Sequence, residues 1–125
     1  MMIINDEFLS LENEAMMMLI KSDKENYSIL QEQYKNATVS ERRFSGSGFF
    51  TEYHVSNEIP RIEQKEKGPL RSVYGRISGL KIGVGFLLYL SDGLIDTLEC
   101  HEYDSIGFPV EITDYELSYS SSILE

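Results

Sequence analysis

An Asp-Gly pair, Asp92-Gly93, separates two runs rich in apolar residues, 84–90 and 94–103. Asp-Gly between two apolar runs is the strongest short-range signal for a β-hairpin, because both residues tolerate the positive φ angles of a tight turn. The turn contains either two residues or three with a glycine bulge, and the sequence leaves both registers open. The two runs therefore predict neighbouring antiparallel strands.

The run that precedes this turn is apolar on both of its faces. Residues 86–90 read Phe-Leu-Leu-Tyr-Leu, without the polar alternation of a strand that has one face in water. We therefore expect a central strand with both faces covered. Two N-terminal helices are the expected cover of one face, and the long loop or a second subunit is the candidate for the other.

Helical periodicity is confined to the N-terminal third of the chain. Apolar residues between Asp6 and Lys21 recur at helical spacing, which predicts an amphipathic helix. Ser22 and Glu25 have the spacing of a capping box, so a second helix is expected to start near Asp23 and to continue to about residue 37.

Extended segments follow the helices. A strand with two-residue alternation is expected at 49–55, after the turn-forming stretch 45–48. Further strands are expected at 73–77 and 115–119, whereas residues 56–70 are typical of a long surface loop within one domain.

These elements predict one α+β domain over residues 1–125. Two N-terminal helices, within about 6–37, pack on a mostly antiparallel sheet of about four to six strands, within about 41–119. With 42% hydrophobic residues, a chain of this length can bury a core. The residues expected in that core are Phe8, Leu11, Leu30, Phe86, Leu88 and Leu98.

Negative charge is concentrated in the C-terminal third. Residues 82–125 contain nine Asp and Glu and no Lys or Arg, so they hold nine of the ten net negative charges. Such a surface repels phosphates, which argues against nucleic-acid binding. It either keeps the domain soluble or attracts a basic partner. For a basic protein partner, the predicted binding residues are Glu99, Glu102 and Asp104.

A single cysteine, Cys100, excludes an intrachain disulfide, and we interpret it as a small core residue. On a strand, Cys100 and His101 face opposite sides, which disfavours a Cys-His dyad. The chain has no apolar run of transmembrane length and no signal-peptide pattern. We therefore expect a cytoplasmic protein that binds neither a membrane nor a cofactor.

Both histidines occur in a Glu-x-His pattern, at 52–54 and at 99–101. Residues two apart on a strand share a face, so each pattern presents a carboxylate and an imidazole together. If the two strands were neighbours, the four side chains would surround a divalent metal such as zinc or manganese. The residues of this alternative metal site are Glu52, His54, Glu99 and His101.

Several short motifs occur together between residues 44 and 119: Gly46-Ser47-Gly48-Phe49-Phe50-Thr51, Gly85-Phe86-Leu87-Leu88-Tyr89, Asp92-Gly93, Leu98-Glu99, Tyr103 and Pro109. The pattern resembles a family of small uncharacterised bacterial proteins. Members often read Leu-Glu-Gly-Tyr-Thr-Tyr and Trp-Pro, where this chain has Leu-Glu-Cys-His-Glu-Tyr at 98–103 and Phe108-Pro109. This departure speaks against Cys100 or His101 as shared catalytic residues and leaves Glu99 as the more family-like position.

The resemblance implies no established activity, and some small acidic proteins of this kind act as immunity partners of secreted toxins. We therefore predict a non-enzymatic protein-binding domain of the bacterial cytoplasm, an acidic immunity-type inhibitor of a basic toxin. The alternatives are a metal-dependent enzyme with the Glu/His site and a structural homo-oligomer, such as a homodimer, that associates through residues 86–90.

Overall fold

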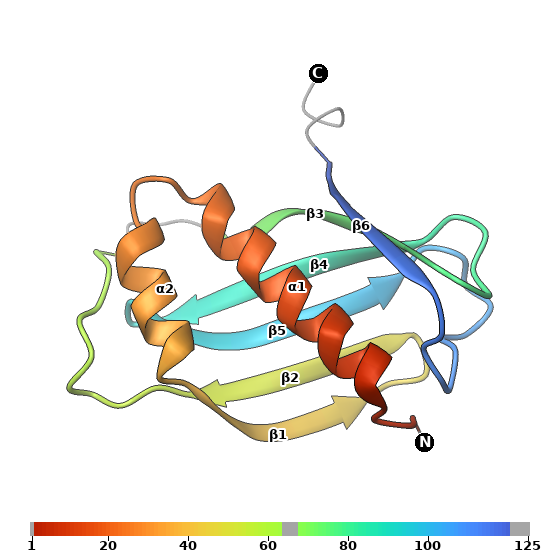
Figure 1. Ribbon diagram of the computed structural model, residues 1–125, viewed down its shortest axis with the longest axis horizontal. Coiled ribbons are helices and arrows are strands. Elements are labelled where there is room, and N and C mark those ends of the chain that lie inside the picture. The colour runs from red at the N-terminus through yellow and green to blue at the C-terminus, as the bar shows by residue number, and fades with distance from the viewer. Residues whose placement is uncertain (1, 64–67, 121–125) are drawn as a thin grey trace.

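The computed structural model describes residues 2–63 and 68–120 of the chain. Within them the chain forms two helices and then six strands: α1 (Asp6–Ser22), α2 (Tyr27–Lys35), β1 (Thr38–Phe44), β2 (Gly48–His54), β3 (Leu70–Ile77), β4 (Val84–Ser91), β5 (Leu94–Glu102) and β6 (Tyr115–Tyr119). The strands form one antiparallel sheet in the order β1-β2-β5-β4-β3-β6. Both helices lie on one face of it (Figure 1), which confirms the predicted α+β architecture. Neither described helix has the length and apolar character that a membrane crossing requires.

The core lies between the helices and the sheet. Alternate residues of the central strands point toward the helices, and the register places Phe49 of β2 and Phe86 of β4 on either side of Cys100 of β5. This apolar face of the sheet and the apolar stripe of α1 are removed from water together, which is the main driving force for their association. All six side chains predicted for the core are buried: Phe8, Leu11, Leu30, Phe86, Leu88 and Leu98.

The β4–β5 turn is the two-residue form of the predicted hairpin. Ser91 pairs with Leu94, and the two residues between them have positive φ angles, 54° at Asp92 and 79° at Gly93. Gly93 is required for a second reason, because a Cβ at this position would overlap with the carbonyl oxygen of Ile62. The loop that follows β2 therefore packs directly on the turn.

A buried glutamine of α2 ties this turn to the helices. The Gln33 Nε2 atom donates to the carbonyl oxygens of Gly93 (2.9 Å) and Pro60 (3.0 Å). The Oε1 atom of the same side chain accepts from the backbone N–H of Ile95 (2.8 Å). Because Gln33 is fully buried, these bonds replace water that the amide and its partners have lost.

The prediction of the second helix is wrong at its start. α1 continues through Ser22, whose Oγ donates to the Leu19 carbonyl oxygen (2.6 Å), so Ser22 does not serve as an N-cap. α2 begins at Tyr27 rather than near Asp23, and it ends at Lys35. A serine can bond back to a carbonyl of its own helix, and here that bond replaces the predicted cap.

The sheet has an edge strand that the sequence did not predict. β1 is polar and mostly exposed, so it shows no apolar alternation. Its Arg42 forms a two-point ion pair with Glu12 of α1, at 2.7 and 2.9 Å, and Thr51 of β2 donates to the same carboxylate. The Glu12 side chain is only 6% exposed, so the charge is compensated inside the protein.

Removing the charge of Glu12 should destabilise the fold. Glu12→Gln leaves the Arg42 guanidinium without its charge partner, and we expect the free energy of unfolding to fall by about 3 kcal/mol. Glu14→Gln, on the exposed side of the same helix, is the matched control and should change it by less than about 0.5 kcal/mol. Urea denaturation monitored by circular dichroism measures both variants. Equal stability of Glu12→Gln and the parent chain would show that the pair contributes nothing.

Within the described residues, no helix covers the opposite face of the sheet (Figure 1). Leu87 and Tyr89 of β4 point to this uncovered face and are partly exposed, whereas Phe86 and Leu88 are buried against the helices. Residues 55–63 of the long loop lie at the β4–β5 turn and not over β4, so they are not the predicted cover; residues 64–67 fall outside the described part of the chain. Cover by a second subunit stays a prediction.

Candidate functional site

The four residues of the predicted metal site lie on neighbouring strands but do not converge. β2 and β5 pair antiparallel, and His101 stands opposite Gly48. His54 lies six residues further along β2, a separation of about 20 Å. Within residues 2–63 and 68–120, no group of three or more His, Cys, Asp or Glu side chains is arranged to hold a metal ion.

The two glutamates of that set have other partners. Glu52 forms an ion pair with Arg43 of β1 (2.9 Å). Glu99 accepts a hydrogen bond from the Tyr89 hydroxyl (2.9 Å), and this bond is the main reason why the pKa of Tyr89 is raised. The strands are neighbours as the metal hypothesis required, but their antiparallel register separates the two imidazoles.

Glu102, one of the three acids predicted to bind a partner, shapes the turn after β5. Its carboxylate accepts hydrogen bonds from the backbone N–H groups of Ile106 (3.3 Å) and Gly107 (3.1 Å). A charge reversal at Glu102 would therefore disturb the backbone as well as the surface charge. Glu99, the first of the three acids, lies on the uncovered face of the sheet.

Asp104, the third of these acids, forms hydrogen bonds with the backbone of the loop between β3 and β4. Its carboxylate accepts from the backbone N–H groups of Lys81, Ile82 and Gly83, at distances of 2.9 to 3.0 Å. Desolvation by itself would raise the pKa of Asp104, but the three amides and the charge of Lys81 lower it overall. The folded loop therefore favours the ionised carboxylate.

The amide protons of residues 81–83 should report the titration of Asp104. The stability contributed by these bonds is present above the ordinary aspartate pKa and is lost as the pH falls through the lowered pKa of Asp104. We expect the three amide resonances to shift together with a midpoint below the ordinary aspartate value, measured by NMR. Asp104→Asn should abolish this shared transition. A shared midpoint at or above the ordinary value would contradict the assignment.

The start of α1 is held beside the segment that leads into β6 (Figure 1). The backbone N–H of Ile3 donates to the Val110 carbonyl oxygen (2.7 Å). Asn5 caps α1 by accepting from the N–H of Phe8 (2.8 Å), and its Nδ2 donates to the carbonyl oxygen of Ile112 (3.0 Å). Residues 107 positions apart in the chain are thus neighbours.

This contact gathers acidic side chains at one end of the domain. Asp6 and Glu7 come from the first turn of α1, Glu111 and Asp114 from the segment before β6, and all four are exposed. Burial, and after it the charges of Glu14 and Glu7, raise the pKa of Tyr115, whereas its hydrogen bond with Ser10 lowers it, so the first turns of α1 lie beside the start of β6. We call this surface the acidic end; its residues are Ile3, Ile4, Asp6, Glu7, Val110, Glu111 and Asp114.

Three aliphatic side chains of the acidic end are open to solvent. Ile3, Ile4 and Val110 are 50%, 41% and 61% exposed. Exposed apolar side chains with a polar rim are typical of protein interaction surfaces. The sequence pattern does not reveal this surface, because its acids come from the first turn of α1 and from the segment before β6. The available signal was the Ile3-Ile4 pair directly before the N-cap residue.

Cys100 is a core residue, as predicted. It is 1% exposed, and desolvation, followed by the charge of Glu99, raises the pKa of its thiol well above the ordinary value. A thiol that stays protonated is a poor nucleophile. His101 faces the uncovered side of the sheet, so the two side chains form no dyad.

Comparison of the chain with protein-family models, curated proteins and solved structures finds no match. The resemblance to small bacterial proteins therefore stays a prediction.

Proposed function

We propose that this chain is a non-enzymatic binding domain whose acidic end docks a basic protein, as an immunity-type inhibitor docks a toxin. The observation that carries the proposal is the exposed aliphatic group Ile3, Ile4 and Val110 among four exposed acids. The proposal places the protein in the reducing bacterial cytoplasm, because its single cysteine has no intrachain disulfide partner.

The two kinds of side chain at the acidic end have different roles in such a complex. Burying aliphatic surface supplies affinity, since the centre of an interface is apolar. The surrounding carboxylates steer a basic partner and set the rate of association. Asp6, Glu7 and Asp114 suit this role better than Glu102 and Asp104, whose carboxylates are engaged with backbone amides. The exposed carboxylate of Glu111 accepts one long hydrogen bond, from the Asn5 side chain (3.5 Å).

The geometry of the rival site favours binding over catalysis. His54 and His101 lie at opposite ends of the β2–β5 pair, so the Glu/His residues do not form one metal centre. The thiol of Cys100 is buried in the core on the other side of β5 from His101.

Charge reversal at the acidic end should slow association with the partner. The variant Glu111→Lys/Asp114→Lys changes two exposed acids that have no part in the core. We expect its association rate to fall at least about tenfold at low salt, with a weaker dependence on ionic strength, because electrostatic steering is lost. The measurement is capture of a basic protein from a lysate of the source organism, followed by surface-based kinetics with that protein.

The matched control is Glu25→Lys/Glu58→Lys, which makes the same change of net charge at two exposed sites outside the acidic end. It should retain the captured protein with an association rate within about twofold of the parent chain. Equal capture by both double variants, or capture only of further copies of this chain, would overturn the proposal.

A further inference from the structure

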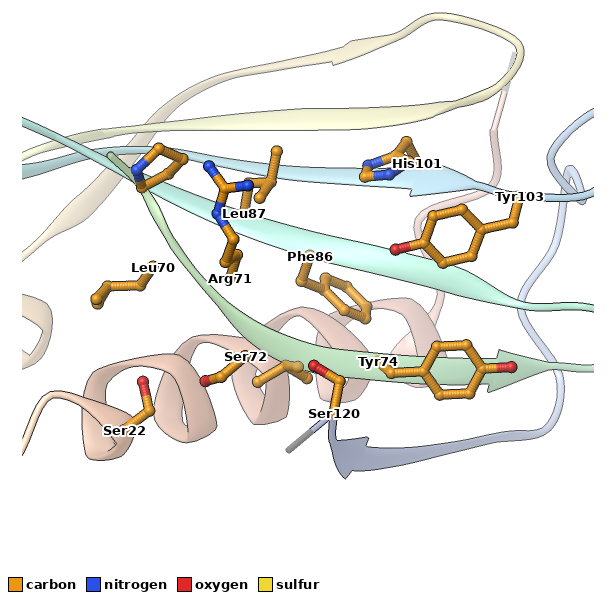
Figure 2. A pocket seen from close by; sticks show the side chains of 12 residues that line it. Ser22, Leu70, Arg71, Ser72, Tyr74, Phe86, Leu87, His101, Tyr103 and Ser120 are labelled. Atoms are coloured by element: carbon orange, nitrogen blue, oxygen red, sulfur yellow. The ribbon is translucent and has the colours of Figure 1, made fainter. Parts of the chain in front are cut away.

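A cavity of about 520 Å³ opens between β3 and β4, lined by side chains of the uncovered face and, toward α1, by Phe86 and Ser22 (Figure 2). This volume lies within the range of sites that hold small molecules. The side chains that matter for its chemistry are Arg71 and Tyr74 from β3, Leu87 from β4, His101 from β5 and Tyr103 just beyond β5. None of them belongs to the acidic end, so the cavity is a separate feature of the molecule.

A β-bulge creates this cavity. Leu70 pairs with Leu88 and Val73 pairs with Phe86, so two residues of β3 stand opposite the single residue Leu87 of β4. A bulge disrupts the ladder and redirects side chains, and here it leaves the space between the strands into which the cavity extends. Arg71 is one of the two extra residues and reaches the cavity from its edge (Figure 2).

The opposite end of the cavity is aromatic. A Cβ at Gly85 would overlap with the hydroxyl oxygen of Tyr103, so this glycine lets the Tyr103 ring lie across β4. The Tyr103 ring is nearly parallel to that of Tyr74 (centroids 6.4 Å apart, 9°) and meets the His101 ring edge to face (5.0 Å, 90°). A flat aromatic ligand would find complementary surfaces there.

Three polar groups that line the cavity form no hydrogen bond or ion pair within the described residues: the Ser72 Oγ, the His101 Nδ1 and the Arg71 guanidinium. The Nδ1 atom of His101 is buried and makes no hydrogen bond to any described residue. The exposed Arg71 guanidinium likewise forms no hydrogen bond or ion pair with the part of the chain that the structure describes. Figure 2 shows Arg71 with Leu87 at one end and His101 with Tyr103 at the other. Buried polar atoms are normally paired, so the His101 nitrogen indicates a missing partner.

We propose that this cavity binds a small aromatic carboxylate with a ring hydroxyl. The Arg71 guanidinium takes the carboxylate, since guanidinium and carboxylate groups form charge-assisted hydrogen bonds. The ring lies on Leu87 and against Tyr103, and the His101 Nδ1 atom pairs with the ring hydroxyl. The site goes beyond the proposed docking of a basic protein and uses none of the same residues.

The test uses 4-hydroxyphenylacetate as the probe and NMR titration of the full chain as the measurement. We expect saturable shifts at the amides of residues 71–74, 85–87 and 101–103, with a dissociation constant of about 1 mM or tighter. Phenylacetate, which lacks the hydroxyl, and 4-hydroxyphenylacetamide, which lacks the charge, should each bind at least about tenfold more weakly. Absence of saturable shifts, or shifts confined to the acidic end, would overturn the proposal.

Two variants test which residue binds the carboxylate of the ligand and which residue binds its hydroxyl. Arg71→Gln should weaken 4-hydroxyphenylacetate at least about tenfold while leaving the amide probe unchanged. His101→Phe keeps a ring in place and should remove the preference for the hydroxylated probe over phenylacetate. Arg76→Gln, an exposed arginine of the same strand outside this cavity, is the matched control and should bind like the parent chain.

Thermal denaturation of each variant separates loss of the site from loss of the fold. We expect melting temperatures close to that of the parent chain, because Arg71 is exposed and forms no ion pair with residues 2–63 or 68–120. If Arg71→Gln folds and still discriminates between the acid and its amide as the parent does, Arg71 does not bind the carboxylate and the proposal fails.

Discussion

A buried carboxylate determines how the two layers of this domain meet. Glu12 projects from the buried side of α1, where a charge without partners would cost several kcal/mol, so the sheet has to supply partners at that point. Arg42 of β1 and Thr51 of β2 stand opposite each other in the register and both bond to the carboxylate. The position of α1 on the sheet is thereby set from the β1–β2 edge. Gln33 does the same for α2 at the β4–β5 turn, through bonds to two carbonyl groups and one amide.

The placement of the helices explains where the two candidate surfaces lie. Because both helices pack on one face, the other face keeps aromatic and polar side chains open to solvent, and a bulge in β3 opens a cavity between β3 and β4. Because the start of α1 meets the segment before β6, acids from both ends of the sequence gather on one surface. The first surface offers ring contacts and one guanidinium, whereas the second offers carboxylates and aliphatic groups. Their chemistries suit different ligands, a small aromatic acid and a basic protein.

Local patterns were sufficient for the parts of the fold that depend on neighbours in the sequence. Asp92-Gly93 predicted the central hairpin because its backbone preferences belong to those two residues, and the apolar residues of α1, β4 and β5 predicted the core. β1 was not predicted because an edge strand needs no apolar alternation. The partner of its partly buried Arg42 is Glu12, which lies 30 positions away in the sequence. The predicted start of α2 was wrong because the spacing of Ser22 and Glu25 fits a capping box. In the structure the Ser22 hydroxyl instead donates to a carbonyl oxygen of α1.

By itself, the sequence determined the class of the fold, the identity of the core and the acidic character of the chain, since these follow from periodicity and composition. Tertiary structure alone decided which charged residues are free to meet a ligand. Glu102 and Asp104 are as acidic as Glu111 in the sequence, yet their carboxylates bind backbone amides, whereas Asp6 and Glu7 join the acidic end from the far terminus. The physical reason is that a hydrogen bond or an ion pair depends on distance in space, and antiparallel register and helix docking bring residues together without regard to their separation along the chain.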